Sequence, residues 1–199
     1  LVRVLGNLTT KEFDPILMLD SFDSINPDDY TAGFPMHPHR GIETISYVSR
    51  GKMVHRDSLG NEAGISDGEV QWMNSGSGIM HEEMVPAAER LLGVQLWLNL
   101  PAKDKMSYNS IKNEDIKEIE IEGGKIRLLA GKYGEHEGYK GDYLSMDYYD
   151  IHLNADAEVT LTMEEDDSVM VFTLLGDVYI DGEHIEEKTA VKLTEGDSL

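Results

Sequence analysis

Short apolar runs separated by turn-forming residues follow one another along the first half of the chain. Successive side chains of a strand point to opposite faces of its sheet, so short alternating runs of this kind predict β-strands. The runs are residues 15–22, 45–47, 70–73 and 91–100, and the turn signals are LGN (59–61), SDG (66–68) and SGSG (75–78). Strands and turns in this succession are typical of an all-β protein.

Three segments interrupt or complicate this pattern. Residues 26–36 contain Asn-Pro, Gly and Pro, and they predict a loop. The run 91–100 would also suit a helix by composition, but Gly93 and the following Pro101 favour a strand. Residues 101–120 are polar, rich in lysine and glutamate and show little periodicity, so we interpret them as a linker that could hold one helical turn.

A second series of strands is predicted after this linker, and no strong helix is visible in either half. The predicted strands are residues 126–131, 148–153, 157–163, 168–176, 178–182 and 189–193. Residues 45–55 resemble residues 171–181 in character, which indicates a duplicated β-barrel. We therefore expect two domains, 1–115 and 116–199, the second with an interior of Val159, Leu161, Met170, Phe172 and Leu174 and truncated at Leu199.

Composition narrows the class of protein. The chain has 199 residues with 17 Lys and Arg against 38 Asp and Glu, a formal charge of −21, which argues against partners that present phosphate, namely nucleic acid and anionic membranes. Cysteine is absent, so thiolate ligands and disulfides are excluded. No basic-then-apolar leader follows Leu1 and no apolar run approaches a membrane span. We expect a cytoplasmic protein.

Potential metal ligands occur in two packets with the same spacing. His37 and His39 are two residues apart, and His81 and Glu83 repeat that spacing after the glycine-rich bend. On strands, each packet directs both side chains to one face, and two neighbouring strands would close a site of three imidazoles and a carboxylate. Such ligands without sulfur suit Fe, Mn, Ni, Cu, Co or Zn. Positions left open on the metal would serve catalysis, whereas a saturated tetrahedral zinc site would be structural.

Glu43 offers an alternative ligand. The pattern His37-x-His39-x-x-x-Glu43 resembles the first conserved motif of the cupin superfamily, where that glutamate often binds the metal. The segment GSGIMH (76–81) resembles the end of the second cupin motif.

A larger match covers most of residues 10–131. The segments HPHRGIET (37–44), HRDSLGN (55–61), GEVQWMNSGSGIMHEEM (68–84) and LLGVQLWLNLPAKDKM (91–106) resemble the pirin family, whose members have two cupin-type β-barrel (jelly-roll) domains. The resemblance implies His37, His39, His81 and Glu83 as ligands. Glu43 would then support the site or the fold, and His55 would lie on a hairpin near the mouth of the site.

The resemblance also implies a function. Bacterial pirin-like proteins include quercetin dioxygenases, which cleave the central ring of a flavonol with O₂. We expect a divalent metal, Fe(II) before Mn, Ni, Co, Cu or Zn, and Glu83 as the base that takes the proton of the flavonol 3-hydroxyl. The alternative is a non-enzymatic, metal-containing regulator that binds protein partners of transcription or metabolism. Its acidic surface would favour a basic protein partner.

The remaining histidines do not form a packet. His136, His152 and His184 stand alone in the second half, and we expect surface or core roles for them. The second domain is therefore predicted to keep the barrel without a metal site.

Overall fold

The computed structural model describes the whole chain except residues 115, 165–166, 195 and 197. The predicted all-β class is confirmed, because the described elements are strands apart from the short 3-10 helix Pro27–Asp29. Among those residues no helix has the length and apolar character that crossing a membrane would require. The chain divides into two compact units, residues 1–117 with 127–149 and residues 118–126 with 150–199.

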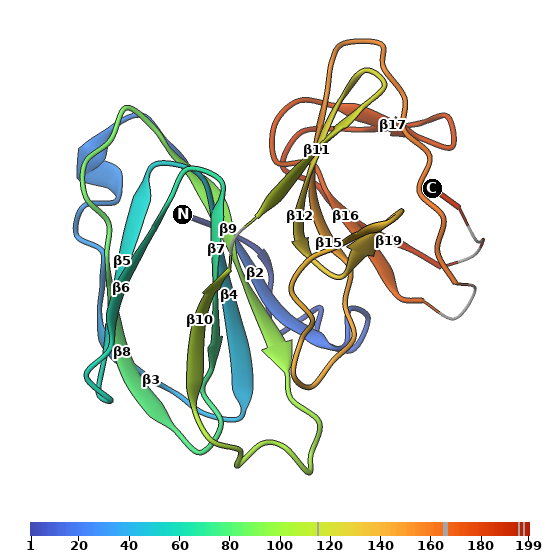
Figure 1. The fold of residues 1–199 in the computed structure, drawn as a ribbon. Coiled ribbons are helices and arrows are strands. Elements are labelled where there is room, and N and C mark those ends of the chain that lie inside the picture. Colours follow the sequence, from blue (N-terminus) through green and yellow to red (C-terminus); the bar gives the residue numbers. More distant parts are fainter. Residues whose placement is uncertain (115, 165–166, 195, 197) are drawn as a thin grey trace. The chain divides into compact units, whose positions relative to one another are not determined.

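The first unit contains two antiparallel sheets, drawn in blue to green in Figure 1. The six-stranded sheet has the order β1 (Val2–Leu5), β2 (Ile16–Ser24), β9 (Leu91–Asn99), β4 (Ile42–Arg50), β7 (Glu69–Asn74) and β10 (Ser110–Glu114). The four-stranded sheet has the order β3 (Phe34–His39), β8 (Ile79–Met84), β5 (Lys52–Asp57) and β6 (Glu62–Ser66). Side chains of the two sheets meet in the interior, as in a jelly roll.

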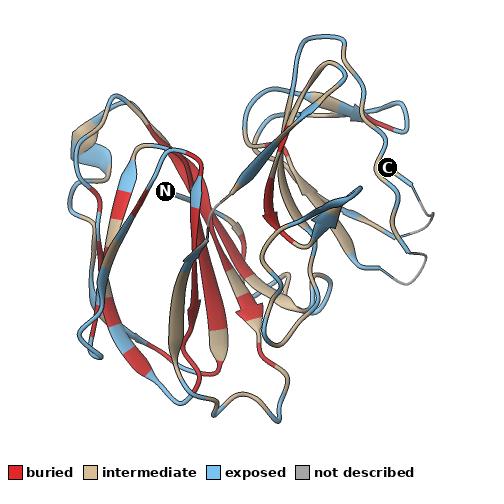
Figure 2. Cartoon of the chain, in the orientation of Figure 1, coloured by how far each residue is buried: buried red, intermediate tan, exposed pale blue. Residues whose placement is uncertain are grey.

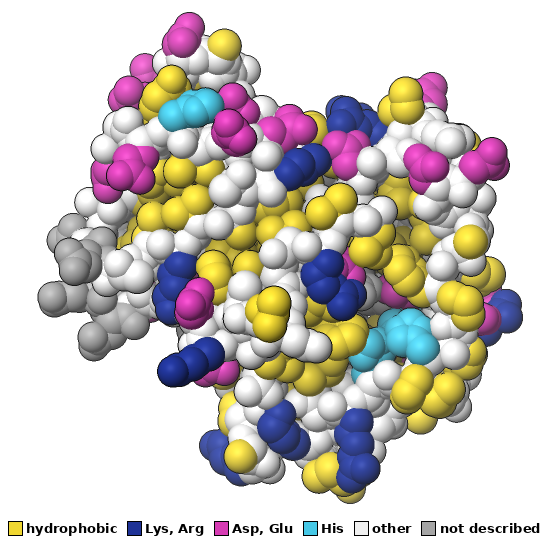
Figure 3. All heavy atoms as spheres, turned by 180° about the vertical axis from the view of Figure 1, so that it is seen from behind, with side chains coloured by type: hydrophobic (Ala, Val, Ile, Leu, Met, Phe, Trp, Pro, Cys, Tyr) yellow, Lys and Arg dark blue, Asp and Glu magenta, His cyan; other side chains and the backbone are white. Residues whose placement is uncertain are grey.

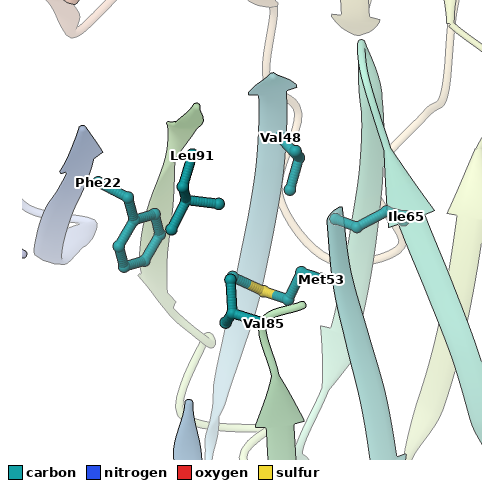
Figure 4. Close-up of a cluster of buried hydrophobic side chains, with 6 residues drawn as sticks. All are labelled: Phe22, Val48, Met53, Ile65, Val85 and Leu91. Atoms are coloured by element: carbon teal, nitrogen blue, oxygen red, sulfur yellow. The ribbon is translucent and has the colours of Figure 1, made fainter. Parts of the chain in front are cut away.

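An apolar cluster joins the two sheets. Phe22, Val48 and Leu91 come from the six-stranded sheet, and Met53 and Ile65 come from the four-stranded sheet (Figure 4). Val85, directly after β8, completes the cluster. Fully burying side chains of this size contributes about 1.5–3 kcal/mol each. This cluster therefore supplies apolar stabilisation to a barrel that also holds polar side chains.

The two faces of β4 are used differently. Ser46 and Val48 point into the barrel, where they meet Glu83 and the apolar cluster respectively. Residues of the other parity point outward, and the segment 127–149, which belongs to the same unit, contacts that face. There Arg127 Nη1 donates to the Tyr47 hydroxyl (3.0 Å). The rings of Trp72 (β7) and Tyr139 lie 4.8 Å apart on the same face.

The segment 127–149 also contains a short hairpin. Its strands are β13 (Lys132–Tyr133) and β14 (His136–Glu137). The segment contacts the outward face of β4 and β7, and Ile45 on that face is fully buried.

The second unit consists of smaller sheets. β11 (Lys117–Ile121), β12 (Gly124–Ala130) and β15 (Tyr148–Leu153) form a three-stranded sheet, of which part of β12 and β15 belongs to the first unit. Two-stranded sheets pair β16 (Val169–Phe172) with β19 (Ala190–Leu193) and β17 (Val178–Ile180) with β18 (Glu183–Ile185). Of its described residues only Ile126, Thr173 and Ile180 are buried (Figure 2).

Several sequence-based predictions differ from the structure. Residues 157–163 do not form the predicted strand, and their described pairing is one bridge between Thr162 and Ser198. The predicted linker 101–120 contains β10 and most of β11. β10 is polar because it lies at the edge of its sheet, where few of its side chains need burial. The predicted loop 26–36 ends early, since β3 begins at Phe34.

The predicted interior of the second domain is also only partly buried. All five of its expected core residues retain solvent exposure: Val159, Leu161, Met170, Phe172 and Leu174. The expected domain boundary falls close to Lys117, where the first segment of the first unit ends. The division into domains 1–115 and 116–199, and the truncation of the second, stay predictions.

Candidate metal centre

The histidine packets lie on neighbouring strands. β3 is the edge strand of its sheet, so Pro38 can stand between His37 and His39 without removing a required hydrogen bond. β3 pairs with β8 in a register that places His37 opposite His81. Gly33, at φ +62°, lets β3 approach closely, because a Cβ at this position would lie 2.4 Å from the Glu83 carbonyl oxygen.

Three imidazoles converge at this point. The ligand atoms of His37, His39 and His81 all lie within 4.8 Å of one another. The Nε2 atom of His37 lies 2.9 Å from Nε2 of His39 and 3.0 Å from Nε2 of His81. His39 and His81 are buried, while His37 is partly exposed. Figure 3 shows histidine atoms at the surface of this unit, bordered by hydrophobic side chains.

The charges of these side chains suit metal binding. Burial, together with the neighbouring His37, lowers the pKa of His39 to about 4. Burial and the charges of His39, His37 and the nearby His55 lower the pKa of His81 to about 3. Both rings are therefore neutral near pH 7, as ligation requires.

The hydrogen bonds around His37 show that the residues fit a cation. His37 Nδ1 lies 2.7 Å from the carbonyl oxygen of Pro35, which can only accept, so Nδ1 carries the proton and Nε2 presents a lone pair. That single lone pair faces the Nε2 atoms of both His39 and His81. It can accept from only one of them. A divalent ion would satisfy such a cluster of imidazole nitrogens.

Glu83 lies on the same face of β8 as His81, but its carboxylate is turned toward the six-stranded sheet. Its Oε1 accepts from Ser46 Oγ (3.2 Å) and Gln95 Nε2 (2.8 Å), and its Oε2 accepts from Gln95 Nε2 (3.1 Å). Burial raises its pKa, and the bonds from Gln95 and Ser46 oppose that rise. Glu83 is not a member of the converging imidazole group. Its ligation stays a prediction.

Glu43 lies on the opposite face of β4 from Ser46. The charged groups that act on it are those of Asp142 and Lys112. Burial, followed by the charge of Asp142, raises the pKa of Glu43 to about 7. Strand alternation thus directs Glu43 to the face of β4 opposite to that of Ser46, although only three residues separate it from His39 in the sequence.

The sequence predicted His55 on a hairpin near the mouth of the site; the residue does lie in the antiparallel pair of β5 and β6, but its side chain is buried. It lies within β5, is 2 % exposed, and its Nδ1 is 3.1 Å from Nδ1 of His81. Its Nε2 lies 3.0 Å from Oδ2 of Asp57. The structure therefore brings a fourth histidine and a carboxylate behind the converging imidazoles.

The histidines outside the packets have separate partners. His152 pairs with Asp150 (2.7 Å) and His184 with Asp177 (3.0 Å), and His136 is exposed. Among the residues that the structure describes, none of the three belongs to a group of metal-binding side chains.

Sequence reasoning missed three residues that support this site: Ser46, Asp57 and Gln95. Ser46 is a polar side chain between Ile45 and Tyr47, Gln95 is a polar side chain in the largely apolar run 91–98, and Asp57 follows His55 at the spacing that shares one strand face. Polar residues at inward positions were the available signal.

The chain is similar to known proteins over most of its length. Residues 2–98 match the family model described as Pirin. The chain is 36% identical to a pirin-like protein of Caulobacter vibrioides, covering 100% of this chain and 75% of that one. It is 35% identical to human pirin, covering 99% of this chain and 69% of the relative. A crystal structure of quercetin 2,3-dioxygenase from Acinetobacter baumannii is 30% identical with a TM-score of 0.85, covering 98% of this chain and 73% of that one. The chain belongs to the pirin family, with its cupin fold.

Proposed function

We propose that this protein is a metal-dependent dioxygenase that cleaves the ring of a quercetin-type flavonol. The observation that carries the proposal is the convergence of three imidazoles at one partly open point of a barrel. The similar chain from Acinetobacter baumannii, named a quercetin 2,3-dioxygenase, supports the substrate class. His37, His39 and His81 would hold a divalent transition metal, Fe(II) before Mn, Ni, Co, Cu or Zn, with Glu83 as the fourth ligand.

The metal supplies Lewis-acid and redox chemistry toward the flavonol and O₂ when it is bound. The residues of this chain determine the access to the metal and the polarity of the surface around it. The partial exposure of His37 leaves one side of the imidazole group accessible. Hydrophobic side chains border the histidine atoms on that surface (Figure 3), and they would favour a flat aromatic molecule over a charged one.

Glu83 is the proposed base. Its carboxylate would accept the proton of the flavonol 3-hydroxyl, so that the substrate O–H bond breaks as a Glu83 O–H bond forms. Ser46 and Gln95 already donate to this carboxylate and hold it in place. Burial in the barrel shields the transferred proton from bulk water, because Glu83 is 3 % exposed.

The test uses protein purified without oxygen and loaded with Fe(II), Ni(II) or Mn(II) in turn. Loss of flavonol absorbance and O₂ uptake are measured together. We expect equimolar consumption of both with at least one metal. If fully metallated protein consumes neither, the dioxygenase proposal is wrong. The acidic chain, at −21, would then favour a regulator that binds a basic protein partner.

A further inference from the structure

We propose that Asp57 and His55 form a hydrogen-bonded relay that fixes the proton of His81 on Nδ1 and aims its Nε2 at the centre of the imidazole group. Both are positioning residues, since neither reaches that centre itself. This inference rests on the proposed metal centre, which it deepens by identifying what keeps one ligand in its binding form.

The relay begins at Asp57, whose two carboxylate oxygens both accept hydrogen bonds. Oδ1 of Asp57 accepts from the backbone N–H groups of Leu59 (2.8 Å) and Asn61 (3.1 Å) and from Asn61 Nδ2 (3.2 Å). Oδ2 accepts from Asn61 Nδ2 (2.9 Å) and faces His55 Nε2 (3.0 Å). Burial alone would raise the pKa of Asp57, but these hydrogen bonds outweigh it and hold the pKa below its ordinary value. Because the N–H groups of Leu59 and Asn61 already donate to both of its oxygens, the Asp57 carboxylate is the acceptor of its contact with His55 as well.

The position of each proton follows from that acceptor. His55 must carry its proton on Nε2 to donate to Asp57, so its Nδ1 presents a lone pair. His81 Nδ1, 3.1 Å from His55 Nδ1, must then be the donor. The remaining nitrogen of His81, Nε2, is left as a lone pair that faces Nε2 of His37 at 3.0 Å.

The result is a site prepared for a cation. Pro35 fixes His37 in the same tautomer, so two lone pairs face each other, and neither can donate to the other. His39 is positioned differently, with its ring edge-on to Trp97 at a centroid distance of 4.9 Å. Each imidazole of the group is thus positioned by a different contact, namely the Pro35 carbonyl for His37, the His55 ring for His81 and the Trp97 ring for His39. Outer partners of ligating histidines typically account for about 10–100-fold in metal affinity.

The experiment compares three variants with the wild-type chain. His55→Phe keeps a ring of similar size but removes both hydrogen bonds. His55→Gln retains an oxygen to accept from His81 and an N–H group to donate to Asp57. His152→Phe is the matched control, because His152 also pairs with an aspartate two residues away but lies outside the imidazole group.

Two measurements are made on each variant. Long-range ¹H–¹⁵N NMR of metal-free protein reports which nitrogen of His81 is protonated, and competition with a coloured chelator reports Ni(II) affinity. We expect Nδ1–H on His81 in wild type, His55→Gln and His152→Phe, with Ni(II) affinity within a few-fold. His55→Phe should lose the single tautomer and bind Ni(II) about 10–100-fold more weakly.

The relay is refuted if folded His55→Phe keeps the wild-type tautomer and affinity. Should His55→Phe not fold, Asp57→Asn replaces an acceptor oxygen by N–H donors and should move the His81 proton, with the same NMR readout. Wild-type protein that shows the predicted tautomer but binds no metal would contradict the proposed metal centre and leave the relay standing. The two proposals therefore fail in distinguishable ways.

Discussion

The two units each contain a histidine bonded to an aspartate two residues away on a strand, yet only one of these pairs adjoins a candidate site. In the first unit, His55 and Asp57 are 3.0 Å apart, with side-chain exposures of 2% and 0%. In the second, His152 and Asp150 are 2.7 Å apart, with exposures of 39% and 15%. The shorter contact is the more exposed one. Hydrogen-bond length therefore does not distinguish the pairs, whereas burial and the neighbouring imidazoles do.

The architecture of the units explains this difference. In the first unit, two facing sheets with long registers enclose an interior, and residues of both sheets meet there, as the contacts of Glu83 with Ser46 and Gln95 show. In the second unit, the sheets have two or three strands and few described residues are buried. Water screens charges and competes for hydrogen bonds at exposed positions, so the same residue types have weaker consequences there.

The largest effect is expected from a change inside the imidazole group. His37→Ala removes a converging nitrogen, and metal and activity should be lost together. Since the loss of an outer partner alone costs about 10–100-fold in affinity, a lost ligand should exceed about 100-fold. Metal content after dialysis and flavonol turnover provide the measurements. The exposed His136→Ala in the same unit is the control, and stoichiometric metal in His37→Ala would contradict the assigned site.

Glu83→Gln separates proton transfer from metal binding. Glutamine keeps an oxygen that can bind a metal and accept from Ser46, but it cannot serve as the base. Turnover by fully loaded protein should fall by about 10²–10⁴-fold, the usual range for loss of a general base. Metal analysis of the same sample excludes metal loss as the cause. Unchanged turnover at full loading would show that another group takes the proton.

Glu43→Gln tests whether burial raises the pKa of an ionisable group of the first unit that lies on the outward face of β4. The folded state raises the pKa of Glu43 from the ordinary 4.5 to about 7, so folding disfavours its ionised form. Its contribution is favourable below about pH 4.5 and is lost as the pH rises through about 7. The variant should therefore exceed wild type in unfolding free energy by on the order of 1–3 kcal/mol at pH 8.

The same variant should show no such advantage near pH 4.5, where the wild-type side chain is protonated in the folded protein. Urea unfolding at both pH values measures the difference. The exposed Glu89→Gln serves as the control and should change the unfolding free energy by less than about 0.5 kcal/mol at either pH. An advantage of Glu43→Gln that is equal at both pH values would reject ionisation as its cause.

The smallest effect is expected in the second unit. His152→Ala breaks the partly exposed pair with Asp150, and such pairs contribute about 0–1 kcal/mol to stability. Metal stoichiometry and turnover should not change. A second bound ion in wild type that disappears in His152→Ala would overturn the contrast between the units.

How much of this could be predicted from the sequence differs between the fold and the site. The strands 16–24, 69–74 and 91–99 follow from alternation and turn chemistry, which are local properties. Strand β10 could not be recognised in this way, because its polar residues pair with β7 only once the sheet exists. Residues 157–163 show the opposite error: their alternating pattern predicted a strand, but their described pairing is limited to the bridge between Thr162 and Ser198.

At the site, the sequence by itself determined the pairing of His37 with His39 and of His81 with Glu83. Residues two apart on a strand must share a face, and this holds before any tertiary contact forms. Tertiary structure alone decided which charged side chains surround Glu43 and that His55 lies behind His81. Those outcomes depend on which sheets face each other and on which side chains the packed sheets shield from water. Such relations join residues far apart in the chain, so no local pattern encodes them.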